Sequence, residues 1–326
     1  MASRNPRGAV PVPDCMSSPD FRTDAPLSPA PWGIGGHRPG CACALHGRRS
    51  FTAGLAAAAL LPAVVPAAAQ GVREDVGERS QFAHLVPAEQ IEAAAAAQYR
   101  QLLREAAQQR ALAPDNHPQV VRLRSIAQRM IPHGHPWNRR AAQWQWEVNL
   151  LGSDQINAFV MPGGKIAFYW GLLQRLQLDD DEVAAIMGHE MAHALREHAR
   201  ERMGKTAATR IGANLLSSLF GLGAVGDTVL AMGAQLLTLR FSREDESEAD
   251  LVGLELAART GHDPAAGATL WEKMMAASRG APPEFLSTHP AGQSRVRDIR
   301  AKLPKVQPLF EAAERPPRRF GPPPRA

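Results

Sequence analysis

Apolar residues recur at helical spacings along much of this chain. In residues 88–112, the apolar side chains from Ile91 to Leu103 follow such a spacing, and Pro114 ends the segment. The same kind of pattern predicts further helices at residues 118–130, 180–203, 243–260, 264–278 and 291–303. The chain is therefore predicted to be mainly helical.

Three short segments between the second and third of these helices differ in pattern. Residues 143–151, 155–161 and 165–169 alternate or are rich in β-branched and aromatic residues, and Pro162-Gly163-Gly164 forms a turn between the last two. This arrangement predicts a β-hairpin or a small meander. The expected fold class is α+β, mainly helical, with the β-unit flanking a cleft.

Residues 211–239 form a long apolar run with a single charge, Asp227, and the run is interrupted by Gly221, Gly223, Gly226 and Gly233. The glycines break a continuous span, which favours a buried helical hairpin that covers the segment 180–203. The alternative is a lid that gates substrate or touches a membrane. That alternative predicts peripheral membrane contact through residues 211–239.

The N-terminal part has the features of an export signal. Arg48 and Arg49 directly precede the uncharged stretch 51–69, which ends in three alanines before Gln70. A charged region, a weakly apolar region and a small-residue cleavage site predict a signal peptide of the twin-arginine type, and hence a periplasmic bacterial protein. Pro62 and the alanine content argue against the alternative, an uncleaved membrane anchor.

These signals divide the chain into five parts. Residues 1–46 are predicted to be a disordered extension or the result of a start assigned too far upstream, and residues 47–69 are the signal peptide. Residues 70–114 form an N-terminal helical segment and residues 115–303 the main domain. Residues 304–326 form a tail rich in proline and arginine that is predicted to be disordered.

Composition narrows the classes of function. With 44% hydrophobic residues, the chain can bury a sizeable core. The net charge of +5 comes from the ends, because residues 1–69 carry six Arg against three Asp and residues 304–326 carry five Lys or Arg against two Glu. The body is nearly neutral, so no nucleic-acid partner is expected. All three cysteines precede residue 50, which excludes a cysteine peptidase.

One motif carries the candidate chemistry, namely His189-Glu190-Met191-Ala192-His193. Inside a helix, residues four apart project from the same face, so His189 and His193 can reach one metal ion. Glu190 lies beside such an ion. Zinc acidifies a bound water, and a carboxylate can then take the proton as general base. The motif thus predicts two zinc ligands and the base of a peptidase.

A catalytic zinc ion needs a third protein ligand. His198 is rotated away from His193 on a continuous helix, since successive side chains are about 100° apart, and it is interpreted as a structural or surface residue. The acidic stretch 242–250 offers two pairs, each on its own helix face: Glu246 with Asp250, and Glu244 with Glu248. Spacing alone does not choose between these pairs.

The order His-Glu-x-x-His and then Glu-x-x-Ala-Asp resembles the CAAX prenyl protease and HtpX family of zinc metallopeptidases, which are gluzincins. The resemblance implies that Glu246 is the third zinc ligand and that Asp250 orients a ligand histidine. Thr288-His289-Pro290 with Arg295 is similar to the C-terminal motif of the family. This similarity implies that His289 and Arg295 approach the metal and the substrate carbonyl.

A further segment, residues 157–164, resembles the edge strand and turn along which substrate is thought to lie in this family. The resemblance implies that Asn157, Ala158 and Phe159 bind substrate. The resemblance to the family as a whole covers roughly residues 115–303. These residues are therefore expected to form the zinc metallopeptidase domain. The CAAX prenyl protease and HtpX types have several strong transmembrane helices, and this sequence lacks that feature. In this respect the chain resembles the exported soluble branch of the family, of the BepA, LoiP and YcaL type.

The resemblance implies an endopeptidase with one zinc ion per chain that cleaves unfolded or misassembled envelope polypeptides. The rival interpretation is a chaperone-like binding factor of the envelope whose site is latched shut. An intact Glu190 favours the enzyme, because a pure binder needs no base beside the metal. The sequence leaves the oligomeric state open.

Overall fold

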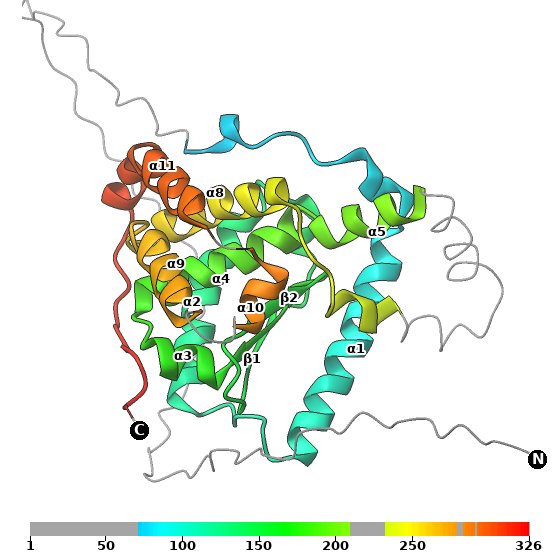
Figure 1. The fold of residues 1–326 in the computed structure, drawn as a ribbon, viewed down its shortest axis with the longest axis horizontal. Coiled ribbons are helices and arrows are strands. Elements are labelled where there is room, and N and C mark those ends of the chain that lie inside the picture. Colours follow the sequence, from blue (N-terminus) through cyan, green and yellow to red (C-terminus); the bar gives the residue numbers. More distant parts are fainter. Residues whose placement is uncertain (1–70, 209–231, 279–282, 291, 326) are drawn as a thin grey trace, which may run out of the picture. The chain divides into compact units, whose positions relative to one another are not determined.

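The computed structural model describes residues 71–208, 232–278, 283–290 and 292–325 (Figure 1). Its helices are α1 (Ala88–Gln108), α2 (Pro118–Gly134), α3 (Trp170–Leu176), α4 (Asp180–Leu195), α5 (His198–Ala208), α8 (Arg243–Arg259), α9 (Ala266–Ala277), α10 (Glu284–Thr288) and α11 (Gln293–Ala312). Its strands are β1 (Glu147–Leu151), β2 (Ala158–Met161) and β3 (Lys165–Tyr169). The expected mainly helical α+β fold is confirmed.

The three strands form one small sheet in the order β1-β3-β2. β2 and β3 pair antiparallel, and their turn contains Gly163 and Gly164, whose φ angles of 81° and 77° favour glycine. The predicted hairpin is thus confirmed. β1 pairs with β3 in parallel, so the meander alternative is wrong, because β3 lies between β1 and β2. β2 is left at an edge of the sheet.

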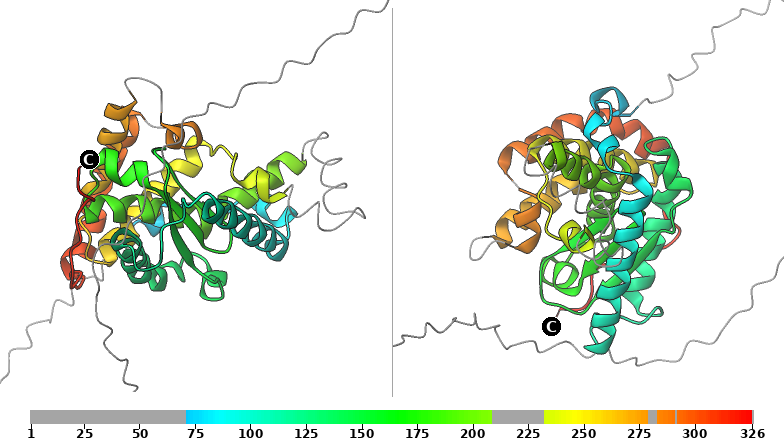
Figure 2. Two further views of the ribbon diagram at one scale, coloured as in Figure 1. Left: turned by 90° about the horizontal axis from the view of Figure 1, so that it is seen from below. Right: turned by 90° about the vertical axis from the view of Figure 1, so that its right-hand side faces the viewer.

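The two faces of the sheet pack against different helices. Successive side chains of a strand point to opposite faces, so Ile166 and Phe168 join the main core with α2, α4 and α8. Ala167 packs on the other side with Tyr99 of α1. α1 therefore covers one face of the sheet, as Figure 2 shows, and the main helical core covers the other.

α4 is the central helix of the main core. Asp179 and Glu182 form a capping box at its start, and every residue of the helix except Asp181 is buried. α8 crosses it at a pair of glycines. A Cβ atom built on Gly188 would lie 2.8 Å from the carbonyl oxygen of Gly253, so any larger side chain there would push the two backbones apart. This close approach brings the acidic start of α8 to the histidines of α4.

Two helix ends differ from the sequence prediction by two turns or more. The helix expected at residues 180–203 ends at Leu195, because Glu197 adopts a left-handed φ of 61°, and α5 begins at His198. The last helix, expected to end at residue 303, continues through Pro304 and Pro308 to Ala312.

The tail beyond that helix, for which the sequence predicts disorder, contacts the start of α4. The backbone N–H groups of Phe320 and Gly321 donate to the Asp180 carboxylate.

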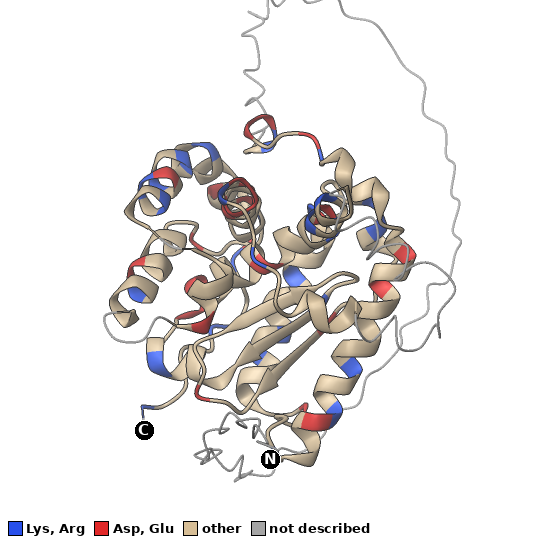
Figure 3. Cartoon of the chain, turned by 45° about the vertical axis from the view of Figure 1, so that its right-hand side comes forward, with Lys and Arg blue, Asp and Glu red and all other residues tan. Residues whose placement is uncertain are grey.

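Most of the apolar run 211–239 lies outside the described residues, as do the predicted extension and signal peptide at 1–69. In the described end of that run, Met232 and Leu236 are buried in the cluster that contains α1. Among the described helices, none combines the length and hydropathy that a membrane span requires. Lys or Arg and Asp or Glu are interspersed along these helices (Figure 3).

Candidate metal centre

His189 and His193 project from the same face of α4, one turn apart. Their Nε2 atoms lie 3.1 Å from each other, and both side chains are buried. Glu246, near the start of α8, places one carboxylate oxygen 3.6 Å from His189 Nε2 and the other 3.5 Å from His193 Nε2. The close crossing of α4 and α8 thus assembles two imidazoles and a carboxylate at one point.

His289 adds a fourth donor from the loop that follows α10. Its Nδ1 atom lies 2.9 Å from Glu246 Oε1 and 3.3 Å from His189 Nε2. One donor atom from each of His189, His193, Glu246 and His289 lies within 4.8 Å of the others, and each of these residues is at most 3% exposed. Two nitrogens bound to a tetrahedral zinc ion lie about 3.3 Å apart, given Zn–N distances of about 2.0–2.1 Å. The cluster could therefore bind one metal ion, and its donors suit zinc.

The sequence spacing left open whether Glu246 with Asp250 or Glu244 with Glu248 faces the histidines. In the structure, the first pair does. Glu246 lies in the cluster, whereas Glu244 is exposed at the start of α8. Glu248 points to Arg196 and His198 instead, with Glu248 Oε2 2.8 Å from Arg196 Nε.

Glu190 follows the first histidine and points to the same centre without joining the four donors. Its side chain is 1% exposed, and its Oε1 atom has no hydrogen-bond partner within the described part of the chain. Oε1 lies 3.7 Å from His289 Nε2. Burial raises the pKa of Glu190 to about 7. A carboxyl group with this pKa can both accept and release a proton near neutral pH.

Asp250 and Arg295 contact His189 at its Nδ1 atom. Asp250 Oδ1 lies 3.1 Å from His189 Nδ1, and Arg295 Nη2 donates to the same oxygen at 2.8 Å. Burial opposes the charge of Asp250, but Arg295 and His189 outweigh it and lower the pKa of Asp250 to about 2. Arg295 also pairs with Glu246 at 2.6 Å and lies over the ring of Trp271. The structure thus places Arg295 against two carboxylates of the centre.

Burial lowers the pKa of His193 well below its usual range, so its imidazole is neutral, as a metal ligand requires. Its Nδ1 atom lies 2.9 Å from Nδ1 of His198, which is 1% exposed. His198 is therefore not a surface residue, and of the two interpretations the structural one remains. Its contact with His193 was not expected from the helical spacing. That spacing assumed one continuous helix, and the turn at Glu197 redirects the chain.

The predicted substrate-binding residues lie on or beside the edge strand β2. Ala158 is buried in the main core, and Phe159 packs edge-on against Tyr99 and Tyr169 on the opposite face. Asn157 accepts a backbone hydrogen bond from Tyr169 and keeps its buried Oδ1 atom without a partner in the described residues. The backbone amide of Val160, which the sequence analysis did not single out, hydrogen-bonds to Glu190.

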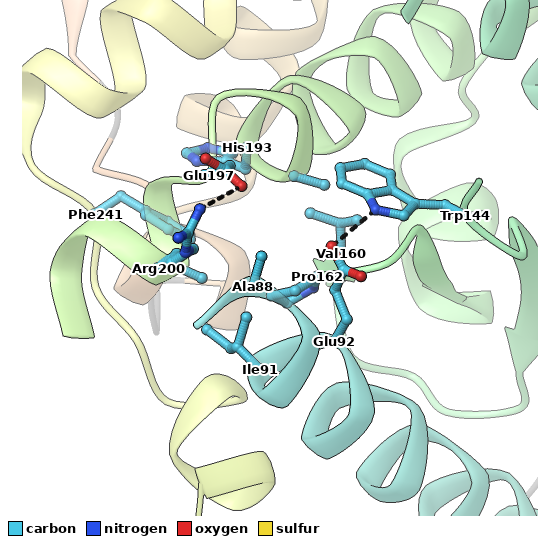
Figure 4. Close-up of a pocket in the computed structure, with 12 residues that line it drawn as sticks. Ala88, Ile91, Glu92, Trp144, Val160, Pro162, His193, Glu197, Arg200 and Phe241 are labelled. Atoms are coloured by element: carbon cyan, nitrogen blue, oxygen red, sulfur yellow. Dashed lines mark hydrogen bonds and ion pairs between the residues drawn. The ribbon is translucent and has the colours of Figure 1, made fainter. Parts of the chain in front are cut away.

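A small recess lies beside His193 (Figure 4). Its free volume is about 20 Å³, close to the space that one water molecule needs. Its wall combines β2, α1 and the α4–α5 turn, with Ile91, Val160 and Phe241 as apolar members. A larger cavity of about 560 Å³ has Glu246, Asp250 and Arg295 in its wall.

Two aromatic rings cover the centre. Phe241 stacks on His193 with ring centroids 4.0 Å apart, and Phe285 of α10 stacks on His289 at 4.4 Å. Together with the exposures of at most 3%, these contacts show a closed centre. The arrangement in this structure is a metal site with four donors and a covered face.

Comparisons with known proteins agree with this geometry. The model of the family described as Peptidase family M48 matches residues 118–303. The chain is 33% identical over 204 residues to a protein of Schizosaccharomyces pombe named "Mitochondrial metalloendopeptidase OMA1", and that match covers 62% of this chain and 58% of the relative. An Arabidopsis thaliana protein of the same name is 38% identical over 152 residues, which is 47% of this chain and 30% of the relative.

A bacterial relative is the "Beta-barrel assembly-enhancing protease" of Escherichia coli. It is 28% identical over 204 residues, which is 57% of this chain and 39% of the relative. The chain thus spans between about a third and about three fifths of these relatives' lengths.

Proposed function

Because this chain belongs to peptidase family M48, we propose that it is a zinc-dependent endopeptidase in which Glu190 is the general base. The observation that carries the proposal is the convergence of four buried donors, beside which Glu190 Oε1 has no hydrogen-bond partner among the described residues. His189, His193 and Glu246 would hold the ion, and His289 would be the exchangeable fourth donor. The sequence resemblance to the HtpX and CAAX prenyl protease type supports the same roles.

The bound ion supplies a Lewis acid that polarises the peptide carbonyl and acidifies the attacking water. Glu190 takes the proton of that water as it attacks the carbonyl carbon, and then gives the proton to the amine that leaves. Its pKa of about 7 suits both transfers. Asp250 keeps the Nδ1 proton of His189 in place, so that Nε2 faces the ion.

Metal removal tests the proposal. The purified protein should cleave unfolded casein, a chelator should abolish cleavage, and added zinc should restore it. Cleavage that continues at the same rate after the metal has been removed, as checked by metal analysis, would contradict the proposal. A protein that prevents casein aggregation without ever cleaving it would support the rival, a chaperone-like binding factor.

The covered centre supports a resting state that is latched by His289. His289 lies within hydrogen-bonding distance of Glu246. It would therefore take the open position on a bound ion that an attacking water needs. In the same casein assay, His289→Ala should therefore raise the basal rate. A fall of about 10²-fold or more would instead assign His289 to stabilising the oxyanion, as expected for loss of a donor to that charge.

We propose unfolded or misassembled envelope polypeptides as the substrate class. The name of the E. coli relative supports a connection with β-barrel assembly, and that relative is 28% identical to this chain over the matched residues. The edge position of β2 also fits an extended segment, which can pair with an exposed strand through its backbone. Asn157, Ala158 and Phe159 would take part through this strand.

A periplasmic location is proposed from Arg48 and Arg49, whereas the names of other relatives refer to mitochondria. Changing both arginines to lysine should leave the precursor in the cytoplasm of a bacterial host, because the twin-arginine route reads this pair. Cell fractionation checks the outcome. Normal maturation of the variant would reject this route. The proposed membrane contact through residues 211–239 is tested by co-sedimentation of the protein with lipid vesicles.

A further inference from the structure

The chain makes a strained turn directly after the second histidine of the motif. Glu197 has a left-handed φ of 61°, which is unfavourable for a residue other than glycine. Two arginines hold its carboxylate: Arg79 Nη1 lies 3.2 Å from Oε2, and Arg200 Nη1 lies 2.9 Å from Oε1. The turn changes the direction of the chain, and the first residue of α5, His198, contacts His193.

A continuous row of hydrogen bonds starts at this meeting point. His193 Nδ1 and His198 Nδ1 are 2.9 Å apart, and His198 Nε2 lies 3.3 Å from Glu248 Oε2. Arg196 Nε donates to the same oxygen at 2.8 Å. His198 is 1% exposed, and the side chain of Glu248 is 27% exposed. The row runs from the centre to the surface.

Metal binding fixes the direction of every bond in this row. His193 presents Nε2 to the other donors, so its neutral ring must carry the proton on Nδ1. Nδ1–H of His193 must then donate to Nδ1 of His198, which forces the His198 proton onto Nε2. That N–H donates to Glu248. A single proton arrangement satisfies all these contacts.

We propose, on the basis of the zinc site proposed above, that His198 and Glu248 are positioning residues that fix the tautomer and orientation of His193. The first histidine has a comparable set of partners, because Asp250 accepts from His189 Nδ1 and Arg295 neutralises Asp250. His189 and His193 therefore each have their own hydrogen-bond acceptor. The contacts of His189 run through Asp250 to Arg295, and those of His193 run through His198 and Glu248 to Arg196. The acceptor for His193 is the imidazole of His198, whereas the acceptor for His189 is the carboxylate of Asp250.

Zinc affinity tests the proposal independently of proteolysis. His198→Ala removes the acceptor, and zinc affinity, measured by competition with a chelator, should fall about 10–100-fold, as is usual for partners of ligand histidines. His198→Asn keeps an acceptor atom at the δ position and should recover most of the loss. The zinc affinity of Glu248→Gln should lie between those of the wild type and of His198→Ala. Equal affinities of His198→Ala and the wild type would overturn the proposal, as would an Asn variant no better than Ala.

Matched controls separate positioning from general damage. His135→Ala changes an exposed histidine after α2, and Glu244→Gln changes an exposed glutamate on α8, so both should bind zinc like the wild type. Melting temperatures of the metal-free variants show whether each has folded.

The wild-type protein gives a test that needs no substitution. In the zinc-loaded protein with ¹⁵N-labelled histidine, NMR should show His193 protonated on Nδ1 and His198 neutral and protonated on Nε2. A proton on Nδ1 of His198 would overturn the proposal even if zinc binds and casein is cleaved. Failure of the wild type to bind zinc would instead reject the proposed function itself, so the two failures are distinguishable.

Discussion

Glu190→Gln should lower the rate of peptide cleavage by about 10²–10⁴-fold, the usual contribution of a general base. The amide has nearly the shape of the carboxyl group but cannot take the proton of the attacking water. Zinc content should stay at the wild-type level, because Glu190 is not one of the four converging donors. Steady-state kinetics on a fluorogenic peptide, with metal analysis of the same samples, measures both quantities.

A matched control for this variant is Glu272→Gln on α9, where the glutamate is exposed and pairs with Arg300. It should cleave at the wild-type rate. If Glu190→Gln retains full activity, peptide hydrolysis does not use this centre as proposed. If it loses zinc as well as activity, the carboxylate serves the metal rather than the water.

Glu246→Gln is expected to have the largest effect on metal binding. Its carboxylate lies between His189 and His193, at 3.6 Å and 3.5 Å, and the variant loses both the charge and one oxygen donor. Zinc affinity should fall by more than the about 10–100-fold expected for residues that act through a ligand. Activity should fall with the metal content. Chelator competition and cleavage assays on the same preparation show whether zinc affinity and cleavage rate fall together.

Glu244→Gln is the appropriate control, because it lies on the same helix and belongs to the pair that the sequence spacing did not exclude. It should keep zinc and activity. The reverse result, with zinc lost from Glu244→Gln and kept in Glu246→Gln, would show that the face of α8 assigned to the metal is wrong. Glu246→Gln also leaves Arg295 with fewer anionic partners, so the melting temperature of its metal-free form should be compared with that of the wild type.

The sequence predicted those parts of the centre that depend on local geometry. His189, Glu190 and His193 lie within one buried helix, where spacing alone sets their directions. Glu246 and His289 reach the same point through the packing of α4, α8 and the loop after α10, which no local spacing encodes. Their assignment came from the resemblance to a family, and the structure brings the two residues to the cluster.

Features that depend on contacts between distant segments could not be predicted from the sequence. Glu197 ends α4 without a glycine or proline to mark the break, and Arg79, more than a hundred residues earlier, helps to hold the turn. His198 could therefore not be recognised as a partner of His193 from spacing. The parallel pairing of β1 with β3 was missed for a related reason, because strand order is set by tertiary packing rather than by alternation.

The cover over the centre has a consequence for the exchange of the metal. All four donors are at most 3% exposed, with Phe241 and Phe285 stacked on two of the imidazoles. We expect an ion held there to leave when the segments that carry Phe241 and Phe285 move aside. At high chelator concentration, the rate of inactivation should therefore reach a plateau equal to the rate of opening. Such a protein would keep its zinc through brief scarcity, and the lifetime of its activity would be set by a motion of the chain rather than by the equilibrium affinity.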